Sequence, residues 1–150
     1  MIKDCMKEAV ISISHTARVR DAVQIFQENP IGTLPIVNNE YKLVGIVLLR
    51  DLLDLVMPDF MHLLENIDFI RNFGALVDNR QPAAHDLDEP LIDMMHIPVS
   101  VHPDTRLLQG AAVLHKHDLR DVPVVDDYGC LVGLASHVDI GRALMKNWQI

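Results

Sequence analysis

The sequence predicts an α/β fold made of two copies of one strand-helix-strand-strand-helix unit. Two short patterns carry this prediction because they occur twice in the same order. Thr33–Val37 (TLPIV) recurs as Asp121–Val125 (DVPVV), and Gly45–Asp51 recurs as Gly133–Asp139. The offset is 88 residues in both cases (123 − 35 and 139 − 51). Duplicated units in a short chain normally pack on each other because each leaves an apolar face open, and the cleft between them is a natural place for a ligand.

The first unit, residues 1–57, has five predicted elements. Apolar residues between 17 and 27 have helical spacing, and Asn29-Pro30-Ile31-Gly32 breaks that helix. The apolar runs on both sides of the turn at 38–40 are typical of strands, and Pro58 stops the last helix. The predicted order is a strand at 10–13, a helix at 17–27, strands at 34–37 and 42–48, and a helix at 49–57.

The second unit, residues 91–150, repeats this order. Pro103-Asp104-Thr105 is expected to cap its first helix, and Asp126-Asp127-Tyr128-Gly129 predicts a turn between two strands. Even the start recurs, since Asp4-Cys5-Met6 is answered by Asp93-Met94-Met95 at an offset of 89 (93 − 4). The predicted elements are a strand at 99–101, a helix at 106–117, strands at 122–125 and 131–135, and a helix at 137–146.

Residues 58–90 have no copy in the other half. Asp59 can cap a helix over residues 59–74 that carries several large apolar residues and ends at Gly74. Residues 78–90 are then expected to form a polar linker. The helix has two interpretations: a packed crossover between the units, or a lid or partner-docking helix.

Composition is that of an ordinary soluble globular protein. The 150 residues are 49% hydrophobic and 23% charged, no apolar run approaches the roughly 20 residues of a membrane span, and no signal peptide is evident. Cys5 and Cys130 do not make a disulfide framework, so a cytoplasmic location is expected. The formal charge of −8 argues against nucleic acid or an anionic membrane as a partner.

The duplicated pattern Gly-h-x-[Thr/Ser]-x-x-Asp, in which h is apolar, suggests a binding chemistry. Its hydroxyl and its carboxylate lie at a strand-to-helix junction, three residues apart, so both can face one way. A carboxylate is a strong acceptor for a vicinal diol, and a hydroxyl with free N–H groups suits a phosphate. These groups together outline a ribose-phosphate site. The alternative is a helix N-terminus with an ordinary capping Asp.

With these residues in place, the chain resembles a tandem pair of CBS domains, also called a Bateman module. The resemblance rests on the paired starts, the two Pro-containing strands, the two Gly-containing strands (LVGIV and LVGLA) and the two motif aspartates. It implies two β-α-β-β-α repeats packed with pseudo-two-fold symmetry. It also implies a non-catalytic regulatory or energy-sensing module that binds AMP, ADP or ATP, or less often S-adenosylmethionine, between its repeats. A homodimer and an unknown regulated protein are the implied partners.

Carrying the family sites over by position gives one complete cleft and one poorer cleft. The stronger site takes its phosphate and ribose contacts from the second repeat and its adenine wall from the first: Arg120, Ser136, His137 and Asp139 with Ala17, Ala22, Ile31 and Gly32. The weaker site keeps the motif aspartate but has Leu where Thr or Ser is expected and Gly32 where a basic residue is expected. Its residues are Asp51, Leu48, Thr105, Gly110 and Leu119. We therefore predict one competent site and one weak or vacant site.

The sequence raises three other interpretations. His115 and His117 could bind a metal, but positions two apart on a helix do not face each other, and no metal site is predicted. No nucleophile elbow or phosphate-binding P-loop occurs, and Asp126 and Asp127 sit in a turn, so no enzyme is predicted. The rival from another class is a protein-interaction or scaffold module with vacant ligand clefts, which Leu48 and Gly32 favour for one cleft.

Overall fold

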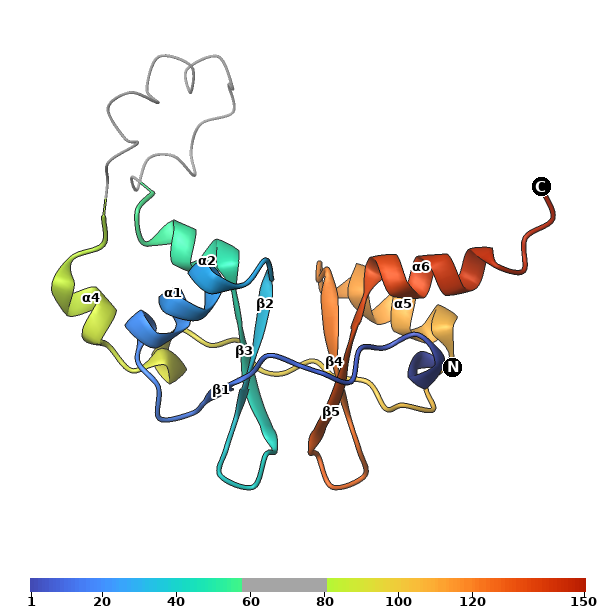
Figure 1. Ribbon diagram of the computed structural model, residues 1–150, viewed down its shortest axis with the longest axis horizontal. Coiled ribbons are helices and arrows are strands. Elements are labelled where there is room, and N and C mark those ends of the chain that lie inside the picture. The colour runs from blue at the N-terminus through green and yellow to red at the C-terminus, as the bar shows by residue number, and fades with distance from the viewer. Residues whose placement is uncertain (58–80) are drawn as a thin grey trace, which may run out of the picture.

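The computed structural model describes residues 1–57 and 81–150, and these form two similar α/β halves, drawn side by side in Figure 1. The predicted α/β class is confirmed, and in the first half so is the predicted order of elements. That half contains β1 (Ile13–Ser14), α1 (Val19–Glu28), β2 (Thr33–Val37), β3 (Leu43–Leu48) and α2 (Leu49–Asp54). The second half contains α5 (Leu107–Lys116), β4 (Asp121–Val125), β5 (Leu131–Ser136) and α6 (His137–Met145). The helix predicted at 59–74 lies outside the described residues.

The two sheets differ by one strand. In the first half, β1 runs parallel to β2, and β2 is antiparallel to β3. In the second half β4 and β5 are antiparallel, and the strand predicted at 99–101 is reduced to a single parallel bridge between Val101 and Val124. The reason is one residue. His15 N donates to Val37 O at 2.9 Å, whereas the equivalent position in the second half is Pro103, which has no N–H to donate.

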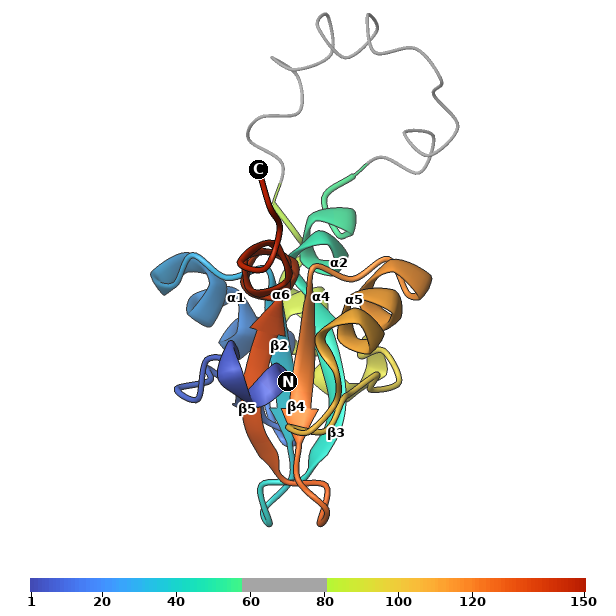
Figure 2. The same ribbon diagram turned by 90° about the vertical axis from the view of Figure 1, so that its right-hand side faces the viewer.

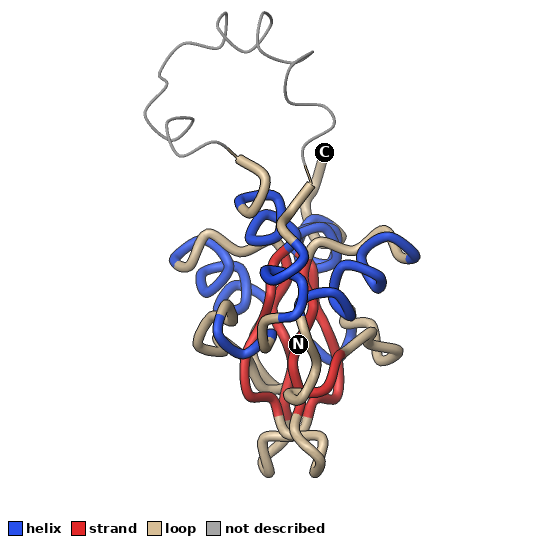
Figure 3. Tube along the Cα trace, turned by 90° about the vertical axis from the view of Figure 1, so that its left-hand side faces the viewer, coloured by secondary structure: helices blue, strands red, loops and turns tan. Residues whose placement is uncertain are grey.

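Equivalent residues of the two halves meet each other, which confirms the predicted pseudo-two-fold arrangement. Thr33 Oγ1 donates to Asp121 Oδ2 at 2.9 Å, and Lys42 forms an antiparallel bridge with Cys130. The members of each pair are 88 residues apart, so each pair lies on the axis that relates the halves. The strands occupy the middle of the molecule with helices outside them (Figure 3), and both hairpin turns lie at the end opposite α2 and α6 (Figure 2).

The leading segment of each repeat packs on the other repeat. Ile2, in the short 3₁₀ helix η1 (Ile2–Asp4), is fully buried in the core of the second half, and its N–H donates to Thr105 O at 2.9 Å. Leu91, in η3 (Leu91–Asp93), is fully buried in the core of the first half, and its N–H donates to Ala17 O at 2.9 Å. The two halves are therefore joined by exchanged segments as well as by their sheets.

The motif glycines make room for these exchanged segments. A Cβ at Gly133 would lie 2.5 Å from the Met6 sulfur and 3.2 Å from the Lys7 carbonyl oxygen, and Gly45 is in the same position against Met95. A glycine in a strand was expected to admit a close approach of another backbone or of a ligand. The approaching group is the protein's own chain.

An exposed ion pair fastens the N-terminal segment to the second half. Lys3 Nζ lies 2.7 Å from Asp104 Oδ1. This hydrogen bond, more than the accompanying charge attraction, lowers the pKa of Asp104 and raises that of Lys3. Because the carboxyl pKa is depressed, the pair contributes to stability at neutral pH and is lost when the pH falls through that lowered value.

Two local predictions are wrong. The stretch at 78–90 was expected to be a linker, but α4 (Ala84–Asp88) forms within it, since Leu87 packs on the first core and Asp88 Oδ1 accepts a 2.9 Å hydrogen bond from Arg20 Nε. Thr105 was expected to help cap the following helix. Its hydroxyl instead accepts from His102 N at 3.1 Å, so Arg106 stands at the N-cap, and the Arg106 side chain makes no capping hydrogen bond.

Candidate functional site

The carboxylate predicted to bind ribose lies where β5 meets α6. Ser136 is the N-cap of α6: its Oγ accepts from Asp139 N at 3.0 Å and donates to Asp139 Oδ2 at 2.7 Å. Asp139 therefore does act as an ordinary capping residue, and it does so through Oδ2. Among the described residues, Oδ1 of Asp139 has no hydrogen-bond partner. Because the only hydroxyl proton of Ser136 is already donated, Ser136 can donate to a phosphate only by giving up that bond.

Arg120 and His137 lie beside this junction. His137 N donates to Arg120 O at 2.8 Å, and His137 Nδ1 lies 3.2 Å from the same oxygen. Both residues line a cavity of about 490 Å³ between α5 and α6 that also includes His115. Backbone pairing places Ser136 opposite Asp121, the neighbour of Arg120. The structure thus brings Arg120, Ser136, His137 and Asp139 to one end of the second sheet.

A cysteine from the exchanged N-terminal segment lies close enough to Asp139 to feel its charge. Burial raises the pKa of the Cys5 thiol, and the negative charge of Asp139 raises it further. The thiol is therefore kept in its neutral form at physiological pH.

Most residues of the predicted adenine wall do not line a cavity. Gly32 lines a cavity together with Arg120. Ala22 is fully buried in the first core, and Ala17 and Ile31 pack against that core. Of these four residues, only Gly32 faces one of the two cavities described here, so the assignment of the wall stays a prediction.

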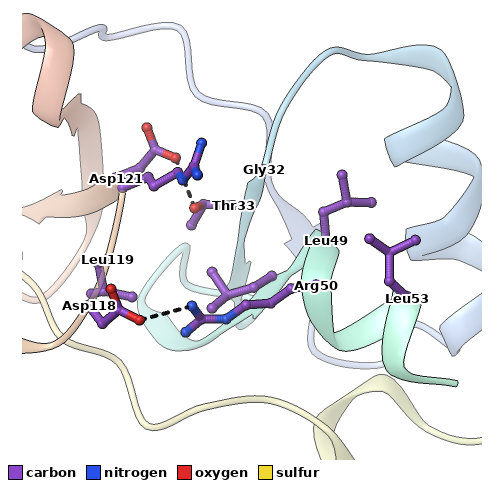
Figure 4. Close-up of a pocket in the computed structure, with 10 residues that line it drawn as sticks. Gly32, Thr33, Leu49, Arg50, Leu53, Asp118, Leu119 and Asp121 are labelled. Atoms are coloured by element: carbon purple, nitrogen blue, oxygen red, sulfur yellow. Dashed lines mark hydrogen bonds and ion pairs between the residues drawn. The ribbon is translucent and has the colours of Figure 1, made fainter. Parts of the chain in front are cut away.

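A second cavity, also of about 490 Å³, lies between the repeats (Figure 4). It contains two residues of the predicted weaker site, Leu48 and Leu119. Gly110 lies elsewhere, buried where an added Cβ would come within 2.6 Å of Ile2, and Thr105 is held by the contacts described above. The cavity is lined by Gly32, Thr33, Leu48, Leu49, Arg50 and Leu53 from the first repeat and by Asp118, Leu119, Arg120 and Asp121 from the second.

The carboxylate of the weaker site is engaged within the protein. His96 Nε2 lies 2.9 Å from both oxygens of Asp51, and Leu48 N donates to Asp51 Oδ2 at 2.8 Å. The Asp51 side chain is only 15% exposed. The sequence offered a signal for His96 that was missed: it follows Met95 at the position where Lys7 follows Met6, so the two halves differ there.

Arg50 is a second residue that the sequence analysis missed. Its Nη1 lies 3.5 Å from Asp118 Oδ2 of the other repeat, across the second cavity (Figure 4). The available signal was the residue just before the motif aspartate, which is Arg50 in the first copy and Val138 in the second. Arg50 therefore supplies a cation in the cleft where Gly32 stands at the position expected for a basic residue.

The other features that could carry a function are a metal cluster, the paired Asp126 and Asp127, and a membrane-spanning helix. Within 1–57 and 81–150, no cluster of three or more His, Cys, Asp or Glu residues could hold a metal ion. Asp126 Oδ1 accepts from the N–H groups of Tyr128 and Cys130, which is a turn-forming role. In the same two ranges, no helix is both long and apolar enough to cross a membrane.

The fold and its cavities define a duplicated α/β module with one cavity between its repeats and another within the second repeat. The chain belongs to the CBS domain family, whose model matches residues 2–58 and 88–146, one segment for each repeat. Protein MJ1426 of Methanocaldococcus jannaschii is 27% identical over 156 aligned positions, which cover 97% of this chain and 91% of that protein.

Solved CBS domain pairs have the same fold. A structure of CBSX2 in complex with AMP has a TM-score of 0.70 at 24% identity and covers 97% of this chain and 96% of its own. The CBS pair of MJ0100 with 5′-methylthioadenosine and S-adenosyl-L-methionine has a TM-score of 0.68 at 23% identity, covering 99% and 98%. The CBS domain of a bacterial CNNM/CorC family Mg²⁺ transporter with ATP has a TM-score of 0.70 at 17% identity, covering 95% and 85%.

Proposed function

We propose that this protein is a non-catalytic regulatory module that binds an adenosine-containing ligand at the end of the second sheet where Asp139, Ser136, His137 and Arg120 lie. The observation that carries the proposal is that one end of the second sheet holds Asp139, whose Oδ1 has no hydrogen-bond partner among the described residues, together with Arg120 and His137. A carboxylate accepts from a ribose diol, and a guanidinium binds phosphate in two parallel hydrogen bonds. The adenine wall is expected from the opposite repeat, where Gly32 is the one predicted wall residue that lines a cavity with Arg120.

The ligands of related structures support an adenosine compound. AMP, ATP, 5′-methylthioadenosine and S-adenosylmethionine are each bound by a CBS pair of the same fold. AMP, ADP or ATP fits the proposed site better than S-adenosylmethionine, because Arg120 provides a cation for a phosphate. We expect the ligand to act as a regulator and not as a substrate.

Regulation follows from where the ligand lies. A ligand that contacts both repeats stabilises the arrangement in which they are correctly spaced, and so shifts an existing equilibrium. The signal would pass to a partner protein, or to a second copy in a homodimer, through α2 and α6, which follow Asp51 and Asp139 directly.

Isothermal titration of AMP, ADP and ATP tests the proposal. Asp139→Ala is expected to weaken binding about tenfold to a hundredfold, since it removes a charge-assisted hydrogen bond worth roughly 1.5–3 kcal/mol. Asp51→Ala, the matched control in the other repeat, is expected to change affinity by less than about twofold, because His96 already occupies that carboxylate. Loss of binding in Asp51→Ala with retention in Asp139→Ala would show that the site is assigned to the wrong repeat.

The second candidate is an interaction or scaffold module with vacant clefts. The engagement of Asp51 by His96 favours it for one cleft. A thermal shift with the same nucleotides separates the two functions, because a ligand at a hundred times its Kd adds about 2.7 kcal/mol of stability. No shift with any adenosine compound would favour the scaffold.

A further inference from the structure

The leading segments of the two repeats place different side chains at equivalent points near the motif aspartates. Lys7 pairs with β5 through two backbone hydrogen bonds of 2.9 Å, and His96 pairs with β3 in the same way at 2.8 and 3.2 Å. Each of these strands leads directly into the helix that carries a motif aspartate. His96 therefore stands toward Asp51 as Lys7 stands toward Asp139.

The two motif aspartates differ in the partner of one carboxylate oxygen. In each repeat, Oδ2 accepts from the backbone N–H of the residue three positions earlier, at 2.8 Å for Asp51 and 3.2 Å for Asp139. Oδ1 of Asp51 lies 2.9 Å from His96 Nε2, whereas Oδ1 of Asp139 has no hydrogen-bond partner in the described part of the chain. At this oxygen, the difference between the repeats is a side chain of the leading segment.

The missing motif hydroxyl does not by itself close a site at Asp51. In the second repeat, the Ser136 hydroxyl donates its only proton to Oδ2 of Asp139 at 2.7 Å, so it supports the carboxylate. Leu48 lacks that hydroxyl, but its backbone N–H still holds Oδ2 of Asp51. The carboxylate is thus fixed in both repeats, and His96 is the group that takes the remaining oxygen of Asp51.

The imidazole of His96 can leave Asp51 without a change in the backbone. The His96 side chain is 48% exposed. Its backbone hydrogen bonds to β3 do not involve the ring, so a change of side-chain rotamer moves the ring into water. Because a carboxylate only accepts hydrogen bonds, Nε2 supplies the proton of this contact, as a ribose hydroxyl would.

We infer that His96 is an autoinhibitory latch, whose ring takes the place of a ribose hydroxyl on Asp51 and keeps an adenosine-containing ligand from binding to the first repeat. The inference rests on the proposed function and adds what closes the second site. Rotation of the ring into water opens that site, and the site closes when the ring donates to Asp51 again. The second repeat has Lys7 at the equivalent position, and its site is open.

Calorimetric titration of AMP into His96→Ala tests the latch. The variant is expected to bind a second AMP at least about tenfold more tightly than the wild type does, because a charge-assisted acceptor becomes available to the ligand. His102→Ala is the matched control, since the His102 side chain is 41% exposed and its Nε2 lies 3.0 Å from a carboxylate oxygen of Asp127. This control should bind AMP as the wild type does.

A double variant identifies the group that the second AMP contacts. Adding Asp51→Ala to His96→Ala should remove the second binding event, because the released carboxylate is then absent. If the wild type binds one AMP and His96→Ala binds no second one, the latch is overturned and the proposed function stands. If neither the wild type nor His96→Ala binds AMP, ADP or ATP, the proposed function is rejected and the latch with it.

Lys7→His transfers the latch to the other repeat. Because position 7 has the same backbone pairing as position 96, an imidazole there is expected to reach Oδ1 of Asp139 and to weaken the first AMP about tenfold. Lys7→Ala removes the lysine without adding a donor and should keep the affinity within about twofold of the wild type. Unchanged AMP affinity in Lys7→His, or an equal loss in Lys7→Ala, would contradict the latch.

Discussion

Leu91→Ala is expected to lower the free energy of unfolding by about 2–5 kcal/mol, the usual cost of removing a large aliphatic side chain from a packed core. Leu91 belongs to the second CBS segment, yet its side chain is fully buried in the core of the first half. The loss should be large because the segment that carries it is also fixed by the hydrogen bond from Leu91 N to Ala17 O. Its backbone therefore cannot easily shift to fill the cavity.

Urea unfolding measures this effect, and the neighbouring residue provides the control. Ile92 is 43% exposed, so Ile92→Ala should cost less than about 1 kcal/mol. Ile2→Ala removes the equivalent residue of the other exchanged segment and should resemble Leu91→Ala. Equal effects of Leu91→Ala and Ile92→Ala would mean that the exchanged segment does not contribute to the first core.

The repeated patterns made most of this fold predictable. Apolar spacing and turn residues act locally, so each main helix and strand was placed to within a few residues of its observed bounds. The one strand that failed did so for a local reason that could have been used: Pro103 has no N–H at the position where His15 donates to β2. The α4 helix was missed because its formation depends on contacts of Leu87 and Asp88 with the distant α1 region.

The repeated patterns did not predict which segments pack on each other. The offset of 89 between the two leading segments identifies them as copies, but it does not say which half each copy packs on. The same limit applies to the site. Ser136 and Asp139 are three residues apart, so their contact follows from local geometry. His96 and Asp51 are 45 residues apart, and Arg50 and Asp118 are in different repeats. Those partnerships arise only from the tertiary fold.

Gly133→Val is expected to destabilise the protein by at least about 1–3 kcal/mol, the cost of overpacking a filled core. The new side chain would meet the Met6 side chain and the Lys7 carbonyl oxygen. Met6 ends in a flexible thioether and can rotate away, whereas the Lys7 backbone is fixed by two 2.9 Å hydrogen bonds with Leu134. Gly133→Ala should therefore be milder than Gly133→Val, because only the larger side chain has to break this backbone pairing.

Gly141→Ala is the control, since a Cβ there has no neighbour within 4 Å and alanine is the better helix former. It should leave urea stability unchanged or raise it slightly.

Gly133→Val should also weaken nucleotide binding in protein that is still folded, because the displaced segment carries Cys5, which lies near Asp139. Gly45→Val should destabilise the protein similarly through Met95 and shift His96, yet spare AMP binding at Asp139. Equal weakening of AMP binding by Gly45→Val and Gly133→Val would contradict the assignment of the AMP site to Asp139.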